Sequence, residues 1–148
     1  MAVRPIPEGY HTVVPYIVAA DAERLLAFMK AGLGAREEHV MRYPDGRIWH
    51  GDVLVGDSHV MLSQATDRHP AMPCTLYLYV PDTDAAYRTA LAAGATSVME
   101  PATQFYGDRN AGVQDSQGNF WYFGTHVEDV SPEEMARRQA EEVKRRQQ

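Results

Sequence analysis

The sequence predicts an α+β fold built from two β-α-β-β-β modules. Strand and helix patterns follow one another in the same order twice, which indicates an internal duplication. The glycines that end the two helix patterns, Gly34 and Gly94, lie 60 residues apart. Short turns join neighbouring strand patterns, as expected for antiparallel hairpins that have their helices on one face of each sheet. We therefore expect a single domain over residues 1–148, with halves at about 11–64 and 74–126.

The first half opens with an apolar, β-branched stretch at residues 11–20, which predicts a strand. Pro15 within this stretch indicates an edge strand or a bulged one. Asp21 has the position of an N-cap, and apolar residues at helical spacing predict a helix over 22–31. The remaining strands of this half are expected over 35–42, 47–55 and 58–64, with turns at 43–46 and 56–57.

The second half repeats this order after a polar linker with two prolines at residues 65–73. A helix is expected over 85–93, because residues 81–84 before it are typical of a helix start. Strands are expected over 74–80, 96–100, near 111–114 and over 119–125, with a loop at 104–109. A Ser-Pro-Glu-Glu sequence at the start of residues 131–148 predicts a C-terminal helical tail.

Composition disfavours several classes of partner. Apolar residues make up 45% of the chain and charged residues 23%, both near the average for globular domains. The net charge of -6 disfavours a nucleic-acid partner, since binding phosphates needs a basic face. No apolar run approaches the roughly 20 residues that span a bilayer, and residues 1–10 lack the apolar segment of a signal peptide. Cys74 is the single cysteine and leaves no internal disulfide, so we expect a cytoplasmic protein.

A charged loop precedes the most aromatic stretch of the chain. The motif QFYGDR at residues 104–109 is followed by a tight turn at 115–118 and by the aromatic strand sequence FWYF at 120–123. Arg109 is a rigid, permanently charged donor that suits an anionic group. A charge on a loop beside an aromatic strand is typical of a binding site. The alternative is a loop-stabilising ion pair between Arg109 and Asp108.

These motifs resemble a known family. QFYGDR at 104–109, HVEDVSPEEMARR at 126–138 and the Asp-x-x-Gly turn before the aromatic strand are similar to the vicinal oxygen chelate superfamily, which includes glyoxalases, bleomycin-resistance proteins and extradiol dioxygenases. The nearer resemblance is to its PhnB-like branch, and it extends over essentially the whole chain. It implies one curved, U-shaped mixed sheet from each half around a cavity, and a homodimer.

The resemblance also implies where a metal would bind. Metal-dependent members place one ligand on the first strand and one on the last strand of each half. When these ligand positions are transferred to the matching strands of this sequence, they fall on Val14, Met61, Thr75 and Tyr122. None is a histidine or a carboxylate, which are the usual ligands together with cysteine, so we expect no metal there and no cofactor. An atypical divalent metal at His50, Asp52 and His59 remains an alternative.

Strand alternation separates side chains that face the helices from side chains that face the cavity. The cavity set comprises the ligand-binding candidates Tyr16, Tyr77, Tyr79, Tyr122 and His59, and the catalytic candidates His50 and Asp52. An aromatic and polar lining is typical of a small-molecule site. The tyrosines could equally pack in the core, and His59 could lie on the surface after its turn. His50 beside Asp52 suits a general base, or the exposed polar face of a sheet.

Three hypotheses of function follow. The first is a metal-free protein that binds a small anionic or aromatic molecule between aromatic walls, with Arg109 meeting an anionic group. The second is a lyase or isomerase with His50 as its base. The third is a dimeric interaction module with a residual pocket. Motifs of nucleotide-binding proteins and serine hydrolases are absent from the sequence.

Overall fold

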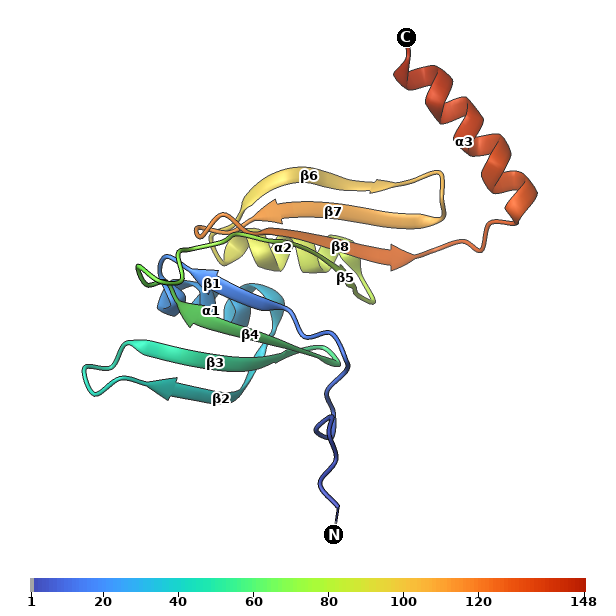
Figure 1. The fold of residues 1–148 in the computed structure, drawn as a ribbon. Helices are drawn as coiled ribbons and strands as arrows, with labels where there is room; N and C mark the ends of the chain where they lie inside the picture. Colours follow the sequence, from blue (N-terminus) through green and yellow to red (C-terminus); the bar gives the residue numbers. More distant parts are fainter. Residues whose placement is uncertain (1) are drawn as a thin grey trace.

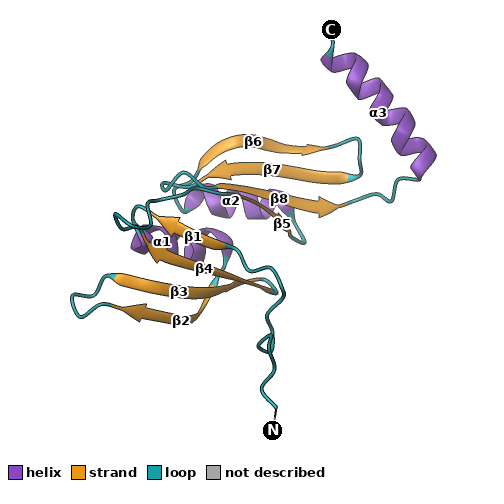
Figure 2. Cartoon of the chain, viewed as in Figure 1, coloured by secondary structure: helices purple, strands orange, loops and turns teal. Residues whose placement is uncertain are grey.

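The structure is a computed structural model, and it describes residues 2–148. Over these residues it contains eight strands and three helices (Figures 1 and 2). In chain order these are β1 (Tyr16–Ala19), α1 (Ala22–Leu33), β2 (Arg36–Arg42), β3 (Ile48–Val55), β4 (Ser58–Gln64), β5 (Thr75–Tyr79), α2 (Thr83–Ala92), β6 (Thr96–Thr103), β7 (Asp108–Gln114), β8 (Phe120–His126) and α3 (Pro132–Arg146).

The strands form two four-stranded sheets with the same topology. The strand order is β1-β4-β3-β2 in the first module and β5-β8-β7-β6 in the second. In each, the first and last strands are parallel and the other neighbours are antiparallel. The helices α1 and α2 lie behind the sheets in the view of Figure 1, so the other face of each sheet is turned toward the viewer. The predicted α+β fold of two β-α-β-β-β modules is confirmed.

Three local features differ from the expected elements. The first strand begins at Tyr16 and not at residue 11. Pro15 contacts β4 only through its carbonyl, which accepts from the Met61 amide at 2.9 Å. Strand β7 begins at Asp108, since the hairpin closes through the Gln104 amide and the Asp108 carbonyl at 2.7 Å. The expected loop at 104–109 therefore ends inside a strand.

The third feature is a β-bulge at Trp49. Met41 pairs with His50 and Arg42 pairs with Ile48, so Trp49 has no partner on β2. The bulge turns Ile48 into the core and leaves Trp49 55% exposed, where it stacks on Tyr43 with the ring centroids 5.9 Å apart. Strand alternation alone would place Trp49 on the face that packs against the helices.

The core lies between the helices and the sheets and runs through both modules. In the first module Leu25 and Met29 of α1 are fully buried beside Leu62 of β4. The largest buried side chain is Trp121 of β8, and Phe28 of α1 packs against it with ring centroids 6.4 Å apart. Contact between the two rings therefore joins the modules within one apolar core.

The tight turn before β8 is built around the buried carboxylate of Asp115. Its oxygens accept from the backbone and side-chain amides of Asn119, each at 3.0 Å, and from Trp121 Nε1 at 2.8 Å. The Gln117 amide donates to it at 2.8 Å, and Gln117 Oε1 accepts in turn from the Asp21 amide at the start of α1. This turn therefore positions the aromatic strand and also links the two modules.

Both ends of the described chain extend from the modules. Residues 2–15 form an arm without helix or strand, and α3 projects away from the sheets (Figure 1). Arg138 connects α3 to the second module through Glu128 at 2.7 Å and the Phe105 carbonyl at 3.1 Å. Within residues 2–148, the helices are too short or too polar to cross a membrane.

The Asp115→Ala variant should lose about 3 kcal/mol in free energy of unfolding, because it leaves buried amide and indole donors without an acceptor. Urea denaturation followed by circular dichroism measures this loss. The matched control is Asp67→Ala at an exposed position, which should change stability by no more than about 0.5 kcal/mol. Equal stabilities for the two variants would contradict a structural role for the Asp115 carboxylate.

Candidate functional site

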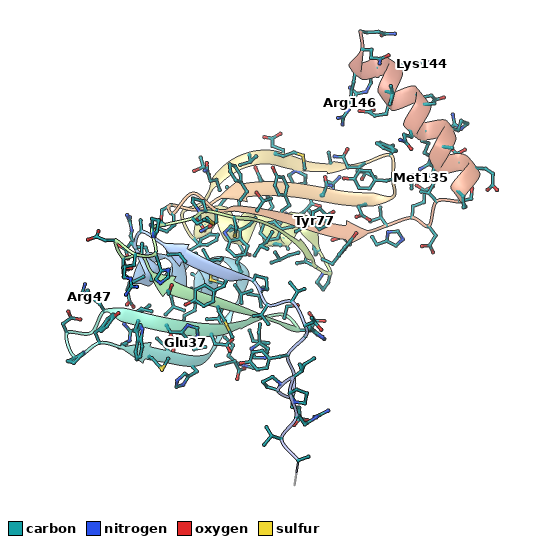
Figure 3. All side chains as sticks on the ribbon, in the orientation of Figure 1. Glu37, Arg47, Tyr77, Met135, Lys144 and Arg146 are labelled. Atoms are coloured by element: carbon teal, nitrogen blue, oxygen red, sulfur yellow. The ribbon has the colours of Figure 1, made fainter. Side chains whose placement is uncertain are left out.

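The face of the second sheet opposite α2 is lined by aromatic and polar side chains. Trp121, Phe123 and Val113 point into the core, so their neighbours along the strands point to the other face. We call this surface the aromatic face; it consists of Thr75, Tyr77 and Tyr79 of β5, Asp108, Asn110, Gly112 and Gln114 of β7, and Phe120, Tyr122, Gly124 and His126 of β8. Tyr77 is labelled on this sheet in Figure 3.

Two glycines make room for the rings on this face. A Cβ atom at Gly112 would lie 2.6 Å from the ring of Tyr122. A Cβ atom at Gly124 would collide with the hydroxyl of Tyr77. Each tyrosine ring therefore lies across the strand next to its own, Tyr122 over β7 and Tyr77 over β8.

The carboxylate of Asp108 lies beneath these rings, with its side chain only 8% exposed. Its Oδ2 atom accepts from the hydroxyl of Tyr79 at 2.8 Å and from that of Tyr77 at 3.2 Å. Its Oδ1 atom lies 3.0 Å from Nδ1 of His126. Burial by itself would raise the pKa of Asp108, but the hydrogen bonds from His126, Tyr79 and Tyr77 outweigh it and hold that pKa below its usual range. Asp108 is therefore an anion at neutral pH.

His126 lies between two carboxylates at the edge of the aromatic face. Its Nδ1 atom contacts Asp108, and its Nε2 atom lies 2.7 Å from Asp129. Since both acceptors are carboxylates, both ring nitrogens must donate, which only the imidazolium can do. The hydrogen bonds to Asp108 and to Asp129 accordingly raise the pKa of His126 above its ordinary value.

A third tyrosine lies near Tyr77 and Tyr79. The buried side chain of Asn110 donates from Nδ2 to the hydroxyl of Tyr106, which lies in the turn before β7. The rings of Tyr77 and Tyr79 meet edge to face with centroids 5.2 Å apart. One end of the aromatic face therefore contains three tyrosine hydroxyls around Asp108 and Asn110.

The equivalent face of the first sheet is covered in part by the chain itself. The buried carboxylate of Asp52 lies 2.9 Å from Nδ1 of His59 and accepts from the hydroxyl of Tyr10. The ring of Tyr10, within the arm, stacks on His59 with centroids 3.8 Å apart. His50 instead lies 3.3 Å from the hydroxyl of Tyr16. The expected pairing of His50 with Asp52 is therefore wrong, because each side chain has another partner.

The positions considered for a metal do not bring ligands together. Tyr16 pairs with Met61 and Tyr77 with Tyr122, so the central positions on the first strands lie two residues beyond Val14 and Thr75. In the part of the chain that the structure describes, no three His, Cys, Asp or Glu side chains are close enough to hold a metal ion. The alternative site at His50, Asp52 and His59 is therefore not formed.

Arg109 is on the opposite side of the second sheet from the aromatic face. Its Nε and Nη2 atoms donate to Asp84 of α2 at 2.7 and 2.9 Å, which lowers the pKa of Asp84. The cause is that β7 already begins at Asp108, so neighbouring residues point to opposite faces. The expected position of Arg109 in the ligand site is wrong, and so is its alternative ion pair with Asp108.

A hollow of about 1020 Å³ lies between the two modules. Of the residues expected to line a cavity, His59, Tyr77 and Tyr79 line it, together with Val13 of the arm and Leu78 of β5. Tyr16, His50, Asp52 and Tyr122 lie on the two open faces but do not line this hollow. The edge of the aromatic face at β5 therefore borders this space between the modules.

Sequence reasoning missed four residues of these faces: Tyr10, Tyr106, Asp108 and His126. Asp108 could have been found, because extending β7 by three residues puts it on the same face as Tyr122. His126 continues the alternation of β8 by one further step. Tyr10 and Tyr106 lie outside the strands, and no periodic pattern indicates where their side chains point.

Solved structures share the fold of this chain. TioX from Micromonospora sp. ML1 superposes with a TM-score of 0.66 at 24% identity, over 79% of this chain and 99% of TioX. TnmS3 from Streptomyces sp. CB03234, described as an antibiotic binding protein, superposes with a TM-score of 0.64 at 20% identity, over 86% of this chain and 99% of TnmS3. At these identities the similarity establishes the fold alone.

Sequence comparison adds the family. The uncharacterized protein Rv0887c from Mycobacterium tuberculosis is 32% identical over 135 residues, covering 82% of this chain and 78% of that protein. The family model of the Glyoxalase/Bleomycin resistance protein/Dioxygenase superfamily matches residues 10–123. This match includes both sheets almost completely, from Tyr10 to the middle of β8. The chain therefore belongs to the Glyoxalase/Bleomycin resistance protein/Dioxygenase superfamily.

Proposed function

We propose that this protein binds a small aromatic molecule on the aromatic face. The observation that supports this most directly is the arrangement of Tyr77, Tyr79 and Tyr122, whose rings lie across β8 and β7 above glycines and the buried Asp108. Rings that are already fixed lose little conformational freedom on binding and offer large flat surfaces for stacking. The description of TnmS3 as an antibiotic binding protein agrees with a ligand of this kind.

Exposure of Tyr77 and Tyr79 also supports the proposal. Their side chains are 44% and 69% exposed. Large aromatic side chains at this exposure indicate a surface that another molecule covers. Because Arg109 is bound to Asp84 on the far side of the sheet, an anionic group on the ligand is not part of the proposal.

Binding has more support in this geometry than catalysis. His50, the expected general base, hydrogen-bonds only Tyr16 among the described contacts. Asp52, which would orient such a base, already accepts from Tyr10 and His59. A lyase or isomerase at this position would therefore need the arm to leave the first sheet.

We also propose that two copies of the chain form a homodimer in which the open faces are enclosed. The arm and α3 extend away from the modules in Figure 1, and Val3 of the arm is 91% exposed. Segments of this kind gain buried surface when they contact a second copy. A cytoplasmic location stays a prediction from the sequence.

Isothermal titration with daunorubicin and with the uncharged 2-naphthylmethanol tests the proposed function. We expect both compounds to bind, and the Tyr122→Leu variant to bind each about five- to tenfold more weakly, since it loses one stacking ring. The matched control is Tyr87→Leu on α2, away from the aromatic face, which should leave both affinities unchanged. Absence of binding for both compounds, or equal losses in the two variants, would count against the proposal.

The mass in solution tests the homodimer. Light scattering should give about 33 kDa, twice the chain mass of 16.6 kDa. Tyr16→Glu places a charge on the exposed first face and should shift the protein toward the monomer. Ala27→Glu on the exposed side of α1 should leave the mass unchanged. A mass of 16.6 kDa at every concentration would contradict the homodimer.

At least two tyrosines should ionise late in a spectrophotometric titration, and the hydrogen bond to Asp108 also raises the pKa of a third, Tyr79. The hydrogen bond to Asp52 raises the pKa of Tyr10 to about 12, and burial raises the pKa of Tyr77 to about 12. At about pH 11 the folded protein should keep at least two more of its eight tyrosines protonated than the chain unfolded in guanidinium, where all ionise near 10. The folded state binds more protons than the unfolded state between about pH 10 and 12, so stability falls as the pH rises through this range.

The Asp52→Asn variant identifies one of these tyrosines. It removes the anionic acceptor of Tyr10, so one tyrosine should return to an ordinary titration near pH 10 while Tyr77 stays late. A titration curve identical to that of the parent protein would show that Asp52 does not control Tyr10.

A further inference from the structure

We propose that the end of the aromatic face formed by Tyr77, Tyr79 and Tyr106 around Asp108 is a binding site for a cationic group, such as a quaternary ammonium. This proposal rests on the proposed function and adds the charge of the ligand to it. Four properties of the site support it, and each comes from the contacts around Asp108.

The first property is the sign of the charge on this face. Asp108 is the only aspartate, glutamate, lysine or arginine among the residues of the aromatic face defined above. His126, which contacts Asp108 and can neutralise it, is shared with Asp129. Two carboxylates and one imidazolium leave one negative charge in excess. Arg109, the arginine next in sequence, is held by Asp84 on the other face.

The second property is the burial of Asp108. Its side chain is 8% exposed, so water screens its field less than that of a surface carboxylate. The carboxylate lies behind the hydroxyls of Tyr77 and Tyr79, within 3.2 Å of both. A cation resting on the two rings would therefore approach a charge that solvent only partly neutralises.

The third property is which hydrogen-bonding groups remain for a ligand. Tyr77 and Tyr79 both donate their hydroxyl hydrogens to Asp108, which leaves only oxygen lone pairs toward the face. The hydroxyl of Tyr106 accepts from Asn110 and keeps its own hydrogen, so Tyr106 alone of the three tyrosines still offers a donor. The oxygen lone pairs of Tyr77 and Tyr79 repel an anionic ligand. The same lone pairs attract a cation and can accept from an N–H group.

The fourth property is the rings themselves. Tyr77 and Tyr79 stand edge to face at an interplanar angle of 63°, so they present two surfaces in different directions around one point. A hydroxyl that donates to a carboxylate makes its ring more electron-rich, which strengthens the attraction of the ring face for a cation. Aromatic side chains set at such angles are the usual surroundings of quaternary ammonium groups in proteins.

The test compares choline with 3,3-dimethyl-1-butanol, which has the same shape but a carbon atom in place of the charged nitrogen. Two-dimensional NMR titrations of the full chain measure affinities in the millimolar range. We expect choline to shift the amides of Tyr77, Tyr79 and Asp108 and to bind at least about tenfold more tightly than the alcohol. Acetate, an anion, should leave these amides unshifted.

Two variants separate charge from ring contacts. Tyr79→Leu keeps an apolar side chain at an exposed position but removes a π surface, and Asp108→Asn removes the charge. Each should weaken choline binding about five- to tenfold and leave the weak binding of the alcohol unchanged. The control is Asp84→Asn, a carboxylate-to-amide change on the other face of the sheet, which should bind choline as the parent does. If Asp108→Asn does not fold, the Tyr79→Leu comparison still decides.

Equal affinities for choline and the alcohol, preferential binding of acetate, or choline binding that Tyr79→Leu leaves intact would each overturn this inference. The outcome is distinguishable from failure of the proposed function. If daunorubicin and 2-naphthylmethanol bind while choline and the alcohol are not discriminated, the aromatic site stands and its cationic preference is wrong. If neither aromatic compound binds, the proposed function is itself wrong.

Discussion

The hydrogen bonds to the Asp108 carboxylate set the shape of the aromatic face. A single buried side chain from β7 connects Tyr77 and Tyr79 of β5 with His126 of β8, so it joins three strands across one surface. An ionised carboxylate at this depth is stable only while it keeps these donors. The rings are therefore held in place by the need of one buried charge for partners, and their positions do not depend on a ligand.

The two modules have the same topology but different surfaces. Both have a buried aspartate on the face away from the helices, with histidine and tyrosine partners. In the first module the tyrosine is Tyr10, which comes from the arm and covers Asp52. In the second module Tyr77 and Tyr79 come from the sheet itself and leave their ring faces open. The duplicated fold thus presents one partly closed and one open surface.

The sequence alone predicted the architecture well where local signals are strong. Asp21 before an apolar helical pattern placed the start of α1, and alternating apolar residues placed β4 over Ser58–Gln64. The side of β7 that Arg109 faces follows by alternation once the strand is known to begin at Asp108, but that start depends on the hairpin closing at Gln104 and Asp108, which no local signal shows. The bulge at Trp49 depends in the same way on pairing with β2.

The site was less predictable than the fold. Alternation placed Tyr16, Tyr77 and Tyr122 on the faces away from the helices, since it needs only a correct strand assignment. The contacts of Asp108 with two tyrosines and a histidine join residues up to 31 positions apart in the sequence. Contacts of this kind follow from tertiary packing, which a local sequence pattern does not show.

The position of Tyr10 has a practical consequence for handling this protein. Tyr10 lies within an exposed arm, and its ring and hydroxyl contact two side chains of the first sheet. A bulky tag fused ahead of the arm would displace the same segment that covers Asp52. Ligand screens are therefore best run with tag-free protein, so that fusion-induced displacement of the arm is not mistaken for an intrinsic opening of the first face.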